Sequence, residues 1–129
     1  LSWPPDALLA GVGLGALSTA ILVVNNLRDI ETDERVGKRT LAVRLGVRGT
    51  QAEYVVALVV AGAVPVVGVV RLDWPALSLM ALAVVPLCLS PLRAVFQYEH
   101  PRELIPALGG TARVVALYGV LLAFGLGLG

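Results

Sequence analysis

Long apolar runs without charge constrain this chain more than any other feature. The first covers residues 7–27 and contains no charged side chain; at about 1.5 Å per residue, a helix of this length crosses a bilayer. Lipid admits only structures that satisfy their own backbone hydrogen bonds. We therefore predict an all-α, polytopic transmembrane helical bundle over the whole chain, with spans at about 7–28, 54–72, 74–94 and 104–128.

The composition agrees with a membrane protein and excludes several other classes. Hydrophobic residues make up 57% of the chain and the mean hydropathy is +0.85, values too apolar for an ordinary soluble domain of this size. A net charge of +1 gives no basis for binding nucleic acid. With one cysteine, Cys88, and one histidine, His100, a disulfide framework or a His- or Cys-rich metal centre is excluded.

The distribution of Lys and Arg between the runs indicates an orientation. Six lie within 28–48 and two within 93–102, whereas Arg71 is alone in the intervening loop. By the positive-inside rule, the loops after the first and third runs are predicted to be cytoplasmic, in a multi-pass protein of the cell membrane. Trp3 and Trp74 then both fall at the outer interface, where indole rings are common.

The end of the first run carries two carboxylates four residues apart. Asn25, Asp29 and Asp33 are expected on one helix face, with Asn26 at its edge. Paired acids at a membrane surface repel each other and are costly to desolvate. Mg²⁺ removes both problems because it binds carboxylate oxygens and shares them with substrate phosphates. This pattern favours a metal–phosphate site, and solvated charges at a helix end are the alternative.

A basic stretch with several glycines follows the two acids. Cations and a flexible backbone suit a metal-bridged diphosphate, which needs counter-charge and close backbone approach. Cytoplasmic loops of membrane proteins are also enriched in Lys and Arg for topological reasons alone, so both interpretations stay open. The residues concerned are Arg35, Lys38, Arg39, Arg44 and Arg48, with Gly37, Gly46 and Gly49.

Arg113 is a charged residue inside the fourth apolar run. An ionisable side chain within a membrane is a functional-site hypothesis by default. Since only 16 residues follow it, Arg113 is equally compatible with an anchor at the cytoplasmic end of a helix, and both interpretations remain open.

Two segments resemble the UbiA-type intramembrane prenyltransferases. Residues 25–46 look like the second Asp-rich motif of that superfamily, and residues 106–113 are also similar. Within it, the chain is most similar to the branch that prenylates 1,4-dihydroxy-2-naphthoate on the way to menaquinone. Members have about nine membrane helices and a first motif of the form Asn-Asp-x-x-Asp-x-x-x-Asp, which this sequence lacks. The chain is therefore expected to be the C-terminal part of such an enzyme.

The resemblance implies a Mg²⁺-dependent transfer of a polyprenyl group from polyprenyl diphosphate to an aromatic acceptor. Asp29 and Asp33 are implied as the catalytic and metal-binding residues. The implied partners are both substrates, the lipid bilayer and the N-terminal half of the enzyme, without which the chain is expected to be inactive. The implied substrate contacts are Asn25, Asn26, Arg28, Lys38, Arg39 and Arg113.

Two alternatives to this function remain. A non-catalytic membrane subunit or cation-binding transporter fragment would use the acid pair in an ion pathway; the acids occur only at the ends of the runs, which disfavours it. A UbiA-type enzyme with another aromatic acceptor, such as one directed to haem or chlorophyll, is the second, because acceptor choice depends largely on pocket residues outside this chain.

Overall fold

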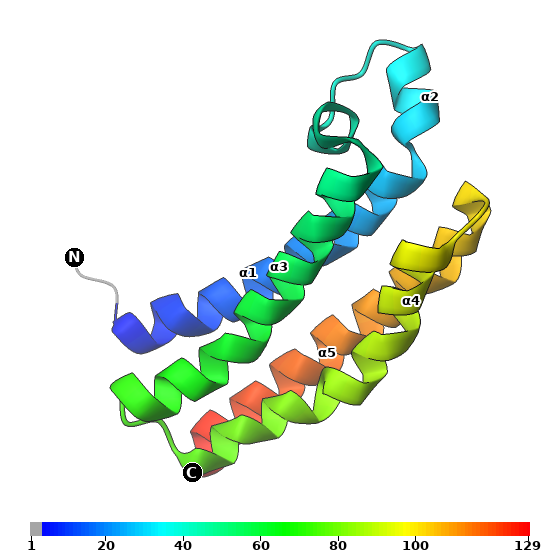
Figure 1. Ribbon diagram of the computed structural model, residues 1–129. Coiled ribbons are helices and arrows are strands. Elements are labelled where there is room, and N and C mark those ends of the chain that lie inside the picture. Colours follow the sequence, from blue (N-terminus) through cyan, green and yellow to red (C-terminus); the bar gives the residue numbers. More distant parts are fainter. Residues whose placement is uncertain (1–3) are drawn as a thin grey trace.

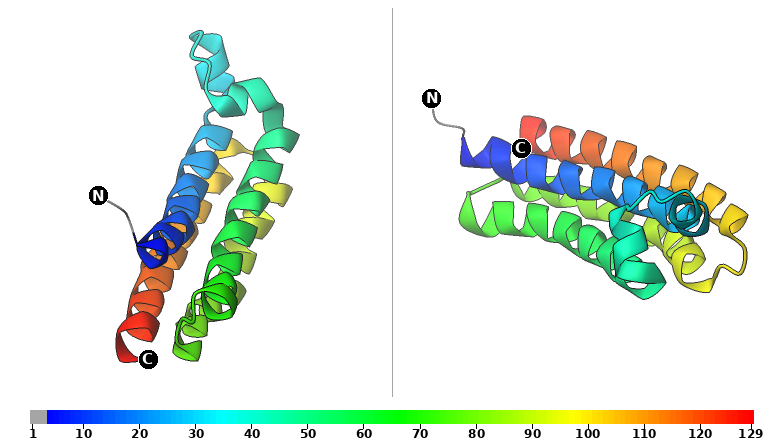
Figure 2. Two further views of the ribbon diagram at one scale, coloured as in Figure 1. Left: turned by 90° about the vertical axis from the view of Figure 1, so that its left-hand side faces the viewer. Right: turned by 90° about the horizontal axis from the view of Figure 1, so that it is seen from above.

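The computed structural model describes residues 4–129 and consists of two helical hairpins packed against each other (Figures 1 and 2). The first hairpin contains α1 (Pro5–Arg28), the short α2 (Ile30–Arg35) and α3 (Leu41–Arg71). The second contains η1 (Ala76–Cys88), α4 (Leu89–Gln97), η2 (Pro101–Leu104) and α5 (Ile105–Leu128). The predicted all-α membrane fold is confirmed, because residues 4–129 form no strand and include four helical segments able to span a membrane.

The observed membrane segments overlap all four predicted spans, but the second begins earlier than residue 54. Hydropathy detects only the apolar part of this helix. Its start is set instead by Thr40, whose hydroxyl accepts a hydrogen bond from the Val43 N–H at 3.2 Å and so caps the first turn. The four segments are Pro5–Arg28, Leu41–Arg71, Ala76–Gln97 and Pro101–Leu128.

The helix α3 changes direction at Gly46. This residue has φ 73° and ψ −179°, and such a positive φ favours glycine because a Cβ would clash with the backbone. The hydroxyl of Thr50 donates to the Gly46 carbonyl at 2.7 Å, so a carbonyl next to the kink keeps a partner. A short helical segment thus precedes the long span.

The segment η1 is wound as a 3₁₀ helix. Its buried residues, Ser78, Ala81 and Val84, are three apart, the spacing at which side chains align in this winding. On the neighbouring α5, a Cβ built on Gly125 would come within 2.5 Å of the Ser78 Cα. The small residue is needed because the two backbones approach closely, as is common between membrane helices.

Buried hydroxyl groups join α3 to α5 through the core. The Tyr54 and Thr111 hydroxyls lie 2.8 Å apart, and the Tyr118 hydroxyl donates to the Ala61 carbonyl at 2.7 Å. Such pairing matters because an unpaired hydroxyl in an apolar interior is costly. The surrounding core forms two clusters, one containing Leu17, Val64, Trp74, Val84 and Tyr118 and the other Val24, Leu27, Tyr54, Val95 and Leu104.

The connections 29–40 and 98–104 lie at the same end of the bundle, and the 72–75 connection lies at the other (Figure 1). At that other end the Trp74 indole N–H donates to Asp6 Oδ1 at 2.7 Å, while Trp3 falls outside the described residues. The two connections that carry most of the basic residues therefore lie at the same end of the bundle, as the positive-inside rule requires of them. Which side faces the cytoplasm stays a prediction.

Candidate functional site

The Asp-rich segment, residues 25–33, turns at Asp29, between α1 and α2. The Asp29 N–H is shared between the carbonyls of Asn25 and Asn26, each at 3.2 Å, and the Asp33 N–H donates to the Asp29 carbonyl at 2.8 Å. Asp29 has φ −98° and ψ 9°, away from α-helical values, so the single helix face predicted through these acids is interrupted there. Leu27 at the end of α1 is buried in the core, whereas α2 buries no residue.

Arg28 neutralises Asp29 in this structure. Its Nε donates to Asp29 Oδ1 at 2.9 Å and its Nη2 to Asp29 Oδ2 at 3.2 Å, a bidentate contact suited to the planar guanidinium. The same Nη2 donates to Asn25 Oδ1 at 2.6 Å. The hydrogen bond from Arg28 is the main cause that lowers the pKa of Asp29; burial opposes it, and the charges of Arg28 and Lys38 add to the lowering. Asp29 is thus ionised and charge-compensated at neutral pH.

Asp29 and Asp33 supply oxygen ligands of the kind that a hard divalent cation prefers. Within residues 4–129, no group of three Asp, Glu, His or Cys side chains lies close enough together to hold a metal ion. Mg²⁺ in proteins is commonly held by one or two carboxylates and completed by waters and substrate phosphates. Asp29 and Asp33 are thus the residues here that could hold such a cation, which would compete with Arg28 for Asp29.

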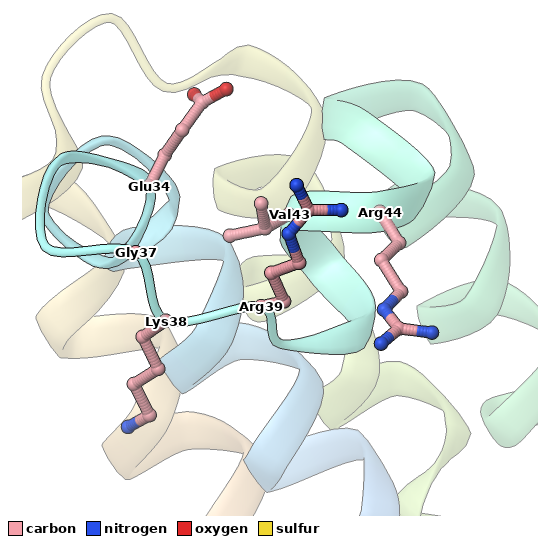
Figure 3. A pocket seen from close by; sticks show the side chains of 6 residues that line it. All are labelled: Glu34, Gly37, Lys38, Arg39, Val43 and Arg44. Atoms are coloured by element: carbon pink, nitrogen blue, oxygen red, sulfur yellow. The ribbon is translucent and has the colours of Figure 1, made fainter.

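A basic pocket of about 300 Å³ follows α2 directly (Figure 3). Its cations are exposed and come from the loop and the first turn of α3. Gly37, with φ +76°, lets the chain reverse direction where a side chain would be strained. An excess of cations around a concave surface favours an anionic ligand. The lining residues are Glu34, Gly37, Lys38, Arg39, Val43 and Arg44.

A backbone hydrogen bond ties this pocket to the Asp-rich segment. The Lys38 N–H donates to the Asp33 carbonyl at 2.8 Å, and the charge of Lys38 also acts on Asp29. In Figure 3 the Lys38 and Glu34 side chains point in opposite directions. The acids and the cations that the sequence singles out are therefore neighbours, with Glu34 turned away from Lys38.

Arg44 lines the pocket as well, although the sequence predicts only Lys38 and Arg39 as substrate contacts in this stretch. A signal was present in the chain: Thr40 is a typical N-cap residue. A helix that starts at Leu41 carries Arg44 in its first turn, next to the loop that holds the other two cations.

The turn between α4 and η2 lies beside the Asp-rich segment. Tyr98 packs against the core cluster beneath that segment, and burial, with the nearby charge of Glu31 adding to it, raises the pKa of Tyr98. The turn is closed by Glu103, whose Oε2 accepts from the backbone N–H groups of Glu99 at 2.6 Å and His100 at 2.9 Å. The 98–104 connection thus packs beneath the Asp-rich segment, which leads into the 29–40 connection.

Arg113 lies in a groove of its own, between η1–α4 and α5. The groove has a volume of about 620 Å³ and shares no lining residue with the pocket around Lys38. The Arg113 side chain is exposed. The structure does not place it among the other predicted substrate contacts. The groove is lined by Pro86, Leu87, Ser90, Pro91, Pro106, Gly109, Gly110, Arg113 and Leu117.

Comparison with known families connects this geometry to a class of proteins. The sequence profile of the UbiA prenyltransferase family matches residues 1–115, a range that contains both the Asp-rich segment and the basic pocket. No solved structure matches the chain.

Several curated relatives share the same name, 1,4-dihydroxy-2-naphthoate octaprenyltransferase. The protein from Mycobacterium leprae is 40% identical over 116 residues, which cover 90% of this chain and 38% of the relative. The protein from Mycobacterium tuberculosis is 40% identical over 122 residues, which cover 95% of this chain and 41% of the relative. The protein from Escherichia coli is 33% identical over 127 residues, which cover 95% of this chain and 40% of the relative. The chain thus spans about two fifths of the length of these relatives.

Proposed function

This chain belongs to the UbiA prenyltransferase family, and from that premise we propose that it forms part of a membrane enzyme that transfers a polyprenyl group from its diphosphate to an aromatic acceptor. The names of its relatives support 1,4-dihydroxy-2-naphthoate as the acceptor, and hence a step of menaquinone biosynthesis. The observation that carries the proposal is the basic pocket joined to the Asp-rich segment by the bond between Lys38 and Asp33.

The pocket provides the counter-charge that a departing diphosphate requires. As the bond between the allylic carbon and the diphosphate oxygen breaks, negative charge grows on the leaving group. Lys38 would act on it as a point charge, and Arg39 and Arg44 through their planar forks. Because these cations already surround the pocket before the reaction, they would stabilise the negative charge that develops on the leaving group.

We propose that Asp29 and Asp33 hold Mg²⁺ against the diphosphate, with Asn25 and Asn26 orienting the two carboxylates. The bound ion would neutralise phosphate oxygens as charge develops on them. Arg28 would then have a role of its own. A cation bound to Asp29 would displace the guanidinium of Arg28, which could then turn to a phosphate oxygen.

The remaining parts of the reaction lie partly outside this chain. The apolar spans would exclude water from the allylic cation until an electron-rich ring carbon attacks it. The attacked carbon then loses its substituent, either a proton or the carboxylate as CO₂, and the ring regains its aromaticity. We propose that the first Asp-rich motif and the acceptor pocket belong to the N-terminal half of the enzyme, and that the α1–α2 end faces the cytoplasm. Arg113 stays a predicted contact for an anionic group in its separate groove.

A prenyl-transfer assay on the full-length enzyme tests this assignment. Asp29→Asn and Asp33→Asn should each lower turnover by about a hundredfold or more, because losing one preorganised electrostatic contact commonly costs that much. Glu31→Gln is the matched control, since Glu31 lies on the same short helix but near Tyr98, and it should retain its rate. Helical content by circular dichroism should be unchanged in all three. Wild-type rates in both Asp variants at limiting Mg²⁺ would refute the metal role.

The 129-residue chain alone provides a second test. It should insert into membranes without forming product, and co-expression with the N-terminal spans should restore activity. Mg²⁺-dependent product from the purified chain by itself would contradict the proposed division of the active site.

A further inference from the structure

A groove between α3 and α4, at the basic end of the bundle, has an arginine at its head. The groove has a volume of about 620 Å³ and is lined by Arg48, Gln51, Ala52, Val55, Val56 and Phe96. The Gln51 side-chain amide donates to the Val95 carbonyl at 2.9 Å, which holds the two walls together. The Arg48 side chain is exposed, and the one ion pair found within residues 4–129, Arg28–Asp29, does not involve it.

The position of this groove along α3 places its head at the membrane surface. A hydrocarbon core of about 30 Å takes about 20 helical residues. Counting back from Arg71, where α3 ends, puts Gln51 near the opposite boundary of that core. Arg48 then lies one turn further out, at the level of the lipid phosphates, whereas Val55 and Val56 lie within the hydrocarbon.

We propose that this groove binds an anionic membrane phospholipid, with the phosphate on Arg48 and an acyl chain along Val55, Val56 and Phe96. A guanidinium is the side chain best suited to a phosphate, and the apolar walls suit methylene groups. A soluble anion would leave those walls uncovered. A lipid meets both requirements, because its phosphate reaches Arg48 while its acyl chain covers the apolar walls.

This lipid site is separate from the proposed reaction and does not depend on it. It shares no lining residue with the pocket around Lys38, and its ligand would be a component of the membrane rather than a substrate. Failure of the prenyl-transfer assignment would therefore leave the lipid site standing, and the reverse also holds.

Native mass spectrometry tests whether Arg48, at the head of the groove, binds the lipid. The purified protein is titrated with phosphatidylglycerol and released from detergent. We expect one saturable lipid adduct, weakened about tenfold by Arg48→Gln, which is the effect of losing one charge-assisted contact. Arg71→Gln is the matched control, because Arg71 is an exposed arginine at the other end of the same helix; it should bind as the wild type does. Equal binding by Arg48→Gln and wild type would overturn the proposal.

A second pair of variants tests the apolar walls. Ala52→Trp should fill the groove and abolish the adduct, whereas Ala63→Trp, at an exposed position of α3 outside the groove, should preserve it; circular dichroism checks that both fold. Inorganic pyrophosphate and geranylgeranyl diphosphate, added as competitors, should not displace the lipid. Displacement by either would overturn the lipid assignment in favour of an anion or substrate site. Failure to detect any saturable adduct would also overturn it.

Discussion

The two connections at the basic end of the bundle use their charged residues in different ways. In the 98–104 connection, Glu103 binds two backbone N–H groups and the adjoining Leu104 is fully buried. In the 29–40 connection, Lys38 and Arg39 stay exposed around a pocket. A carboxylate that closes a turn is part of the structure, whereas cations gathered around a cavity are available to a ligand. The partners of each charge, rather than the number of charges, distinguish the two.

The largest expected effect concerns the side of the membrane that the two connections share. In a Cys88→Ala background, Val47→Cys and Glu99→Cys should be labelled only from the cytoplasmic side, and Asp73→Cys only from outside, because charged thiol reagents do not cross the bilayer. The measurement is labelling of intact cells against inverted vesicles. Labelling of Val47→Cys from the exterior would reverse the orientation and with it the proposed delivery of substrates from the cytoplasm.

An intermediate effect compares one exposed arginine from each connection. Arg39→Ala should raise the KM for prenyl diphosphate in the full-length enzyme about tenfold through the loss of one charge-assisted contact, with a smaller change in kcat. Arg102→Ala, at the same end of the bundle, should leave both constants near their wild-type values. Steady-state kinetics at saturating acceptor measures the difference. If Arg102→Ala raised KM equally, the two connections would not differ in the way described.

The smallest effect concerns the glutamate in each connection. Glu103→Ala should speed hydrogen exchange at the amides of residues 99 and 100, because these N–H groups lose their acceptor. Glu34→Ala removes an exposed side chain beside the basic pocket and should leave exchange in the 98–104 connection unchanged. Hydrogen–deuterium exchange with mass spectrometry reads both. Unaltered exchange in Glu103→Ala would show that the turn is held by other contacts.

Hydropathy predicts the membrane segments of this fold well because lipid forces each span to satisfy its own backbone. It does not detect that α3 begins at Leu41, since that start depends on the Thr40 cap and its first turns carry arginines. Nor does hydropathy predict the 3₁₀ winding of η1, whose backbone packs closely against α5 at Gly125.

The candidate site was predictable in its residue types but not in its internal pairing. The spacing of Asp29, Asp33 and Lys38 along the chain already indicates that acids and cations meet. The bond between Arg28 and Asp29 does not follow from spacing, because neighbours in sequence face each other only where the backbone turns, as it does at Asp29. Arg44 joins the pocket for a similar reason, through the helix start that follows Thr40.

The winding of η1 sets how far along the bundle the 98–104 connection lies. A 3₁₀ helix rises about 2.0 Å per residue and an α-helix about 1.5 Å, so the 13 residues of η1 extend about 6 Å further than they would as an α-helix. The 22-residue segment from Ala76 to Gln97 therefore reaches as far as an α-helix of about 26 residues. Rewinding η1 would draw the turn at Tyr98 back along the bundle by about one helical turn, away from the Asp-rich segment beside which it lies. The position of the 98–104 connection relative to the 29–40 connection thus depends on the rise per residue of η1 and not only on its number of residues.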